Sequence, residues 1–251
     1  MKPVYPLDAS GLSRRSFLGG SASLIFALTA SRGLALSGTV RQNPTFPAYP
    51  FSLGVASGDP TPDGFVLWTR LAPLPLTGGG MPDESVLVNW RVAEDEAMTK
   101  VVAQGSEVAS PDWAHSVHAE VAGLKPDRWY WYEFKAGSEV SQRARTRTMA
   151  LPGTAAAQTS PLRMVFASCQ HYEAGHYTAY EHMLAESPDL VFHLGDYIYE
   201  GPEREDQVRK HIGPEIMTLQ DYRNRHAQYQ DRSRTAGHAS RRTMGGHVGR
   251  P

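Results

Sequence analysis

The sequence has a single cysteine, Cys169, and no apolar run long enough to span a bilayer. One cysteine cannot form an internal disulfide or complete a cysteine-rich zinc site. This excludes a small domain stabilised by disulfides and a small domain stabilised by such a zinc site. Residues 38–231 are poor in basic side chains, with 25 acidic against 16 basic residues, so a nucleic-acid backbone is not expected as a partner. Stable membrane insertion is not expected either. The remaining composition is that of an ordinary globular protein.

Residues 1–37 have the pattern of a twin-arginine export signal. Arg14 and Arg15 precede a weakly apolar stretch over residues 19–30, and small residues follow as far as Ser37, where a signal peptidase could cut. Glycine, serine and threonine dilute this stretch, so a core helix is the less favoured alternative. We therefore expect the Tat translocase as a partner and a periplasmic or extracellular location. Because this route carries folded proteins, it also favours a protein that acquires metal before export.

Residues 38–148 have the pattern of an antiparallel β-sandwich. Apolar and polar side chains alternate over short stretches, which predict strands at 65–68, 86–92, 115–121, 129–134 and 143–148. Turn-forming residues at 57–60 and 62–64 precede the first of these stretches, which predicts a strand, a turn and a second strand over residues 51–70. Leu124-Lys125-Pro126 with Tyr130 and Tyr132 is similar to the tyrosine corner of a fibronectin type III-like sandwich. The aromatic residues are interpreted as packing, and no chemistry is assigned to this domain.

Residues 149–160 are rich in Ala, Pro, Gly and Thr without periodicity, which is typical of a linker between domains. A different pattern follows in residues 161–231, with an apolar run over 163–167, helical spacing over 177–186 and a second apolar run over 190–194. Strand, helix and strand in this order predict the βαβ unit of an α/β domain. Ligands of such a domain are expected at the carboxyl ends of its parallel strands.

Three candidate metal ligands follow the two predicted strands of this unit. Cys169 comes after the first strand, and Asp196 and Tyr199 come after the second. Because the ends of adjacent parallel strands are neighbours, Cys169 and Asp196 can face one space, and the spacing to Tyr199 lets a second oxygen approach the same metal. Thiolate, phenolate and carboxylate suit trivalent iron, and the carboxylate can bridge to a harder cation. Packing is the plain alternative for a lone cysteine and for tyrosines beside a turn, but the combined pattern favours metal ligation.

Five segments of the chain resemble the PhoD-like alkaline phosphatases, in the same order. These segments are FSLGVASGDPTPDGFVLWTRLAP (51–73), GLKPDRWYWYEFKAG (123–137), FASCQHYEAGHYTAYEHM (166–183), DLVFHLGDYIYEG (189–201) and TLQDYRNRHAQY (218–229). The resemblance covers about residues 45–230, and the last three segments are specific. It implies a β-sandwich followed by a metallophosphoesterase-type, calcineurin-like domain that hydrolyses phosphomonoesters and phosphodiesters. It also implies phosphate ester substrates and the cofactors Fe(III) and Ca(II), with Cys169, Asp196 and Tyr199 at metal-binding positions.

Two other functions stay open. One is a secreted, non-catalytic binding module built on the β-sandwich, such as an adhesion or carbohydrate-binding domain. The other is a different enzyme on the same scaffold, such as a nucleotidase or a phospholipase-like esterase. Metal content together with a phosphodiester assay would separate the binding module from the hydrolase.

Residues 232–251 depart from the family pattern. They contain five Arg and four Gly but no Leu, Ile, Phe, Trp or Tyr, so a disordered tail is expected there and not a buried strand. The resemblance implies a Trp-Asp-Asp-His-Glu segment after residues 218–229, with further metal and catalytic groups. Read one base later from Asp231, the codons permit TDPELQAMHRAAPWEVTWDDH, in which Met244 followed by Gly245 forces the first Trp. A frameshift near residue 231 is therefore expected, with a weakly active or inactive product whose catalytic residues are unknown; a natural basic tail is the alternative.

Overall fold

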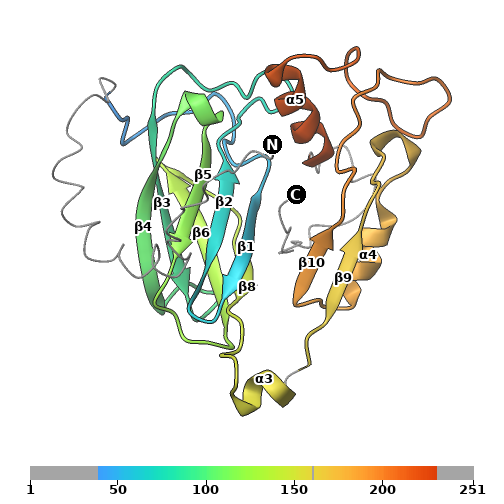
Figure 1. The fold of residues 1–251 in the computed structure, drawn as a ribbon. Coiled ribbons are helices and arrows are strands. Elements are labelled where there is room, and N and C mark those ends of the chain that lie inside the picture. The colour runs from blue at the N-terminus through green and yellow to red at the C-terminus, as the bar shows by residue number, and fades with distance from the viewer. Residues whose placement is uncertain (1–38, 160, 231–251) are drawn as a thin grey trace, which may run out of the picture. The chain divides into compact units, whose positions relative to one another are not determined.

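A computed structural model describes residues 39–159 and 161–230 of the chain (Figure 1). The predicted export signal over residues 1–37 lies outside the described residues, as does the predicted tail over residues 232–251. All the helices and strands below belong to one unit of the chain, which begins at Val40. In the part of the chain that the structure describes, no helix is both long enough and apolar enough to cross a membrane.

Two antiparallel sheets form the predicted β-sandwich. The first sheet has the order β1 (Val55–Thr61), β2 (Gly64–Arg70) and β5 (Ser116–Val121). The second has the order β4 (Val101–Ala109), β3 (Val86–Ala93), β6 (Trp129–Ala136) and β7 (Glu139–Val140), and β8 (Ala144–Arg147) also pairs with β6. A short 3-10 helix, η1 (Pro111–Trp113), lies between β4 and β5. The sandwich part of the predicted fold class is thus confirmed.

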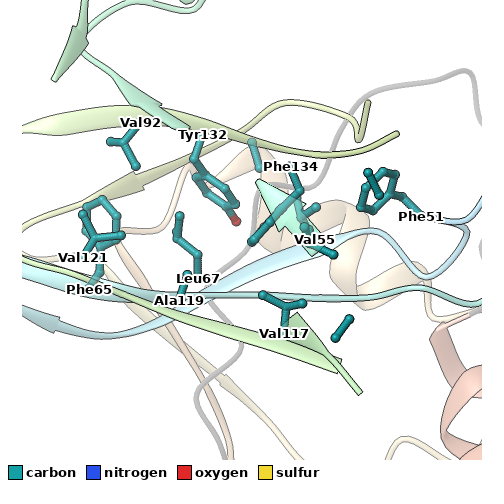
Figure 2. Packing of buried hydrophobic residues seen from close by; sticks show 14 of the residues in the cluster. Phe51, Val55, Phe65, Leu67, Val92, Val117, Ala119, Val121, Tyr132 and Phe134 are labelled. Carbon is teal, nitrogen blue, oxygen red and sulfur yellow. The ribbon is translucent and has the colours of Figure 1, made fainter. Parts of the chain in front are cut away.

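The core of the sandwich lies between the inner faces of the two sheets. Successive strand residues point to opposite faces, so alternate apolar residues of each strand reach this layer. Figure 2 shows Phe65 and Leu67 of β2 beside Tyr132 and Phe134 of β6, all in one buried cluster. Leu67 pairs with Ala119 of β5, and both are fully buried. The alternation seen in the sequence therefore marks the faces that fold inward.

The tyrosine corner predicted near β6 is formed by Tyr130. Its hydroxyl accepts a hydrogen bond from the Lys125 backbone N–H (3.0 Å) and donates one to the Lys125 carbonyl oxygen (3.3 Å). Tyr132 instead packs its ring edge-on against Phe134 in the core. The first of the two candidate tyrosines thus fixes the start of β6 to the segment before it.

The strand, turn and second strand predicted over residues 51–70 are present, but the turn uses only the second group of turn-forming residues. Residues 57–60 belong to β1. The chain reverses after Thr61, and the pairing with β2 shifts register between Gly58 and Thr61, where Asp59 has a φ of 47°. β1 is an edge strand, and an edge strand tolerates a proline and a bulge that would interrupt a central strand. Locally turn-forming residues therefore extend the hairpin here.

Several elements are not predicted by the sequence pattern. The edge strand β4 exposes one face, which carries Val102 and Val108, and half-buries the other, which carries Glu107, so apolar and polar residue types do not alternate along it. The short helix α3 (Ala155–Thr159) lies within residues 149–160, which have no periodicity. A five-residue helix is too short to produce a periodic pattern.

The predicted βαβ unit is confirmed. It consists of β9 (Met164–Ala167), α4 (Thr178–Ala185) and β10 (Leu190–His193), with the short 3-10 helix η2 (Tyr172–Ala174) after β9. The two strands are parallel, with Phe166 opposite Phe192. The side chains of these two residues are 70% and 42% exposed, so this face of the strand pair stays largely uncovered by the described residues.

Helix α5 (Leu219–Gln230) ends the described chain and packs on the sandwich. It begins with a reciprocal cap, in which the Thr218 backbone N–H donates to Asp221 Oδ2 (2.8 Å) and the Asp221 backbone N–H donates to Thr218 Oγ1 (3.2 Å). Ala227 clusters with Leu53 and Ala72 of the sandwich. The cap fixes the start of α5, and the packing of Ala227 holds the helix against the sandwich.

Candidate metal centre

The ends of β9 and β10 bring Cys169 and Asp196 together. Cys169 lies two residues after β9, and Asp196 lies three residues after β10. The parallel hydrogen bonding continues beyond both strands, because the Leu194 N–H donates to the Ala167 oxygen (2.8 Å) and the Cys169 N–H donates to the Gly195 oxygen (3.1 Å). The two candidate ligands therefore occupy neighbouring positions at the carboxyl edge of the strand pair, as the sequence predicts.

One carboxylate oxygen joins the three predicted ligands. Asp196 Oδ2 lies 3.6 Å from Cys169 Sγ and accepts a hydrogen bond from the Tyr199 hydroxyl at 3.2 Å. Cys169 and Asp196 are exposed, and Tyr199 is half-buried. The structure thus places a thiol, a carboxyl and a phenol around one point at the surface of the described chain.

Both loops adopt an unusual backbone conformation at the candidate ligands. Cys169 has a φ of 54° and Asp196 has a φ of 52°. L-residues other than Asn, Asp and His rarely occupy this left-handed region, because Cβ approaches the carbonyl oxygen. Such conformations cluster at functional sites, where the surrounding structure compensates for their cost of about 1–3 kcal/mol. Here each one turns the chain out of its strand at the residue whose side chain joins the site.

The environment of Tyr199 favours the protonated phenol when the three side chains are alone. Desolvation, the hydrogen bond to the Asp196 carboxylate and the neighbouring Cys169 thiol raise the pKa of Tyr199 to about 12. The phenol therefore donates its proton to Asp196 Oδ2 at neutral pH. A cation bound at the same point would replace this proton.

The chemistry of the three donors fits a ferric ion better than a calcium ion. Fe(III) favours anionic oxygen and sulfur donors, and the three donor atoms converge on Asp196 Oδ2. Ca(II) needs about six to eight oxygen ligands, of which Asp196 is the suitable one in this trio. In residues 39–159 and 161–230, the candidate site included, no group of three or more His, Cys, Asp or Glu side chains is placed to hold a metal ion. The candidate site has two such side chains, Cys169 and Asp196, and its third donor is the phenol of Tyr199.

The chain just after Asp196 is fixed through its main-chain oxygens. The Arg225 guanidinium of α5 donates to the carbonyl oxygens of Tyr199 and Gly201. The Glu200 oxygen accepts from the Ile216 N–H at 3.0 Å. Three consecutive carbonyl groups next to the candidate site are therefore hydrogen-bonded.

A buried polar network lies behind this loop. Glu173 is fully buried, and its Oε1 accepts from the backbone N–H groups of Arg204 (3.0 Å) and His211 (3.1 Å). The His211 ring lies between the Gly201 oxygen (3.1 Å from Nδ1) and the Tyr229 hydroxyl (2.9 Å from Nε2). Burial and the nearby Arg225 charge lower the pKa of His211, so its neutral ring donates from Nδ1 to the Gly201 oxygen.

Two further residues link the loops that carry the candidate ligands. The Gln170 side-chain amide donates to the Tyr197 carbonyl oxygen at 2.9 Å. The His171 ring packs against the Tyr199 ring, with centroids 4.4 Å apart. At the level of sequence, Gln170 and His171 stand out only as members of the segment 166–183, and no role is predicted for them, for Arg225 or for the buried network. The one available signal is the polar composition of residues 219–230, which leaves α5 without an apolar face.

Comparison with known proteins agrees with this architecture. The profile of the PhoD-like phosphatase N-terminal domain matches residues 37–150, and the profile of the PhoD-like phosphatase matches residues 164–242. The chain belongs to the PhoD-like phosphatase family. Its second match includes part of the Arg- and Gly-rich stretch over residues 232–251.

A curated protein and a solved structure are both similar to this chain in sequence. Alkaline phosphatase D of Bacillus subtilis (strain 168) is 52% identical over 236 residues, which cover 90% of this chain and 40% of that protein. A solved structure of PhoD is 55% identical with a TM-score of 0.72, over 78% of this chain and 38% of that one. The chain thus spans about 40% of the length of the curated relative it matches. The fold is that of the N-terminal sandwich followed by part of the PhoD catalytic domain.

Proposed function

We propose that Cys169, Asp196 and Tyr199 hold Fe(III) in a metal-dependent hydrolase of phosphomonoesters and phosphodiesters. The observation that carries the proposal is the single oxygen, Asp196 Oδ2, which contacts both the thiol and the phenol. Membership of the PhoD-like phosphatase family supports phosphate esters as the substrate class. When bound, the metals would supply positive charge for the phosphate oxygens and lower the pKa of a coordinated water.

The proposed roles of the three side chains differ. Asp196 is central, because its carboxylate can face the iron and a neighbouring Ca(II) at the same time. Tyr199 and Cys169 would be the donors that favour iron over calcium, because calcium prefers oxygen ligands and a phenolate or thiolate stabilises Fe(III). The left-handed backbone at Cys169 and Asp196 holds both side chains ready for this arrangement.

We also propose that the 251-residue chain is weakly active or inactive. The described residues bring together three donors at the ends of two strands. A centre that activates water and clamps a phosphate needs further ligands from other strands, held rigidly by a completed sheet. The expected deficit therefore lies in the chemical step as well as in metal affinity.

Export by the Tat translocase to the periplasm or the extracellular space is part of the proposal. It is supported by Arg14-Arg15, by the weakly apolar stretch after them, and by the small residues up to Ser37. A protein that folds around iron before export would suit this route.

The test is iron binding by the purified chain and by two variants. Tyr199→Phe removes only the phenolic oxygen, so the visible phenolate-to-iron absorption should disappear while the fold survives. Cys169→Ser should weaken the binding of iron more than that of calcium. Tyr222→Phe is the matched control, because this exposed tyrosine of α5 loses the same oxygen at a different place. If Tyr199→Phe and Cys169→Ser both keep the iron and the absorption of the unaltered chain, the assignment of these two ligands is wrong.

A further inference from the structure

We propose that Arg225 is a positioning residue for the metal centre, which fixes the main chain of Tyr199 and thereby the direction of its phenolic oxygen. The inference rests on the proposed function of the Cys169, Asp196 and Tyr199 site. It concerns a residue that does not itself contact that site, and it is argued from contacts on the opposite side of the loop.

The Arg225 side chain is buried and turned toward the loop after β10. It is 2% exposed, although it lies in a helix at the end of the described chain. Its Nη1 donates to the Tyr199 oxygen and, at 3.1 Å, to the Gly201 oxygen, while Nη2 lies 3.5 Å from the Pro214 oxygen. A buried guanidinium is costly unless its donors are satisfied. Here they are satisfied by main-chain oxygens of one irregular segment.

Other donors complete the same attachment. The Glu200 oxygen, between the two carbonyl groups that Arg225 binds, accepts from the Ile216 N–H at 3.0 Å. The Gly201 oxygen is shared with the His211 ring. Every carbonyl oxygen of residues 199–201 thus accepts a hydrogen bond, and Arg225 donates two of these hydrogen bonds.

The contacts of the Tyr199 side chain show what these main-chain hydrogen bonds control. The Tyr199 hydroxyl lies 3.2 Å from Asp196 Oδ2, and its ring packs on His171. A tyrosine can turn about its side-chain bonds, so a fixed backbone and a ring contact are both needed to keep its oxygen in place. A ligand must be held to within about 0.5 Å of its productive position. Loss of the Arg225 guanidinium would remove the hydrogen bonds that fix the Tyr199 backbone and leave only the ring contact.

Two substitutions of Arg225 distinguish the effect of its positive charge from the effect of its planar guanidinium group. Arg225→Met keeps much of the apolar stem and removes all donors. Arg225→Lys keeps the charge but has a compact ammonium group, which lacks the planar fork of arginine and cannot reproduce its paired geometry. We expect the order of effects to be Met greater than Lys, with Lys restoring part of the arginine behaviour.

Arg223→Met is the matched control. Arg223 lies two residues earlier on α5, and its Nη2 donates to the Asp112 oxygen of the sandwich at 2.9 Å. This variant removes the same charge from the same helix and leaves the attachment of residues 199–201 intact. Protection of the β6 amides reports in every variant whether the sandwich is folded.

The experiment combines two measurements. The first is amide hydrogen exchange, without metal, of residues 196–201 and of Ile216, whose N–H donates to the Glu200 oxygen. The second is Fe(III) titration followed by visible absorption. Loss of hydrogen bonds from a charged donor predicts exchange about tenfold faster in Arg225→Met than in Arg223→Met. Iron affinity should fall about tenfold, with a shifted or weakened phenolate-to-iron band, and Arg225→Lys should lie between Arg225→Met and the unaltered chain.

The outcomes distinguish this inference from the proposed function. If the amides of residues 196–201 and of Ile216 exchange as slowly in Arg225→Met as in Arg223→Met, the inference is overturned. The inference is also overturned if amide exchange in this loop becomes faster in Arg225→Met while the phenolate-to-iron absorption and the iron affinity stay unchanged. Arg225 would then have a structural role only. If the unaltered chain binds no iron while the exchange contrast between the two variants is present, the proposed metal function fails and the restraint of the Tyr199 backbone by Arg225 stands.

Discussion

Replacing Tyr130 with Phe removes one hydroxyl from the tyrosine corner and leaves the buried ring in place. The hydroxyl accepts from the Lys125 N–H and donates to the Lys125 oxygen. That oxygen keeps a second partner, because the Thr148 hydroxyl donates to it at 2.7 Å. The substitution therefore leaves one backbone N–H without its partner.

An unsatisfied buried donor costs about 1–3 kcal/mol. Lys125 lies at an exposed position, where water can reach its N–H in part, so the lower part of this range applies. We expect Tyr130→Phe to lower the free energy of unfolding by about 1–2 kcal/mol. At about 2–4 °C per kcal/mol for a chain of this size, the melting temperature should fall by about 2–8 °C.

Urea unfolding and thermal unfolding measure this effect, with Tyr49→Phe as the control. The Tyr49 hydroxyl donates to the Val140 oxygen at 3.1 Å, but this hydrogen bond is exposed and water can replace it. Its loss should change the free energy of unfolding by no more than about 0.5 kcal/mol. Equal losses in the two variants would refute the reasoning, because they would show that burial of the corner does not determine the cost.

Three further predictions concern the buried acid of β6, export and the reading frame. Burial alone would raise the pKa of Glu133, but hydrogen bonds from Arg143 and Arg91 lower it. Glu133→Gln should therefore lower the free energy of unfolding by about 1–3 kcal/mol at pH 7. In urea titrations, the difference in this free energy between the two proteins should shrink as the pH falls below the unfolded-state pKa of about 4.3 and through the lower folded-state pKa. A difference that does not depend on pH would contradict the ion-pair account. Lys-Lys in place of Arg14-Arg15 should leave the precursor in the cytoplasm in a fractionation assay, whereas unchanged export would exclude the twin-arginine signal. Deleting one base near codon 231 should give a product with more bound iron and higher phosphodiesterase activity at alkaline pH than the 251-residue chain, and equal values for the two proteins would argue against a shifted frame.

The sequence predicts those parts of the fold in which one face of a strand is buried and the other is not. Phe65 and Leu67 alternate with less buried neighbours in β2, and the pattern reports this directly. β4 lies at a sheet edge, where its exposed face carries valines and its half-buried face carries Glu107, so residue type does not follow burial there. The predicted turn lies later than residues 57–60 for a related reason, because an edge strand can contain residues that would end a central one.

The proximity of Cys169 and Asp196 could be predicted because it depends only on topology. Parallel neighbouring strands place their carboxyl ends side by side, whatever the packing around them. The contact of both Cys169 and Tyr199 with one oxygen of Asp196 could not be predicted at that level. It depends on the left-handed backbone at two positions. Cys rarely adopts this conformation, and Asp adopts it more often but at few of its positions, so neither residue type predicts it.

The role of Arg225 shows why the surroundings of a site are harder to predict than its ligands. Residues 194–218 contain no helix or strand, so their carbonyl groups must find partners outside regular secondary structure. A helix that serves such a segment buries donors such as Arg225 and Gln228 in place of apolar residues, and it then lacks the apolar stripe by which helices are recognised. A polar helix next to a long irregular segment is therefore a place to search for buried donors. In this chain the buried donor Arg225 of such a helix binds the main-chain oxygen of Tyr199.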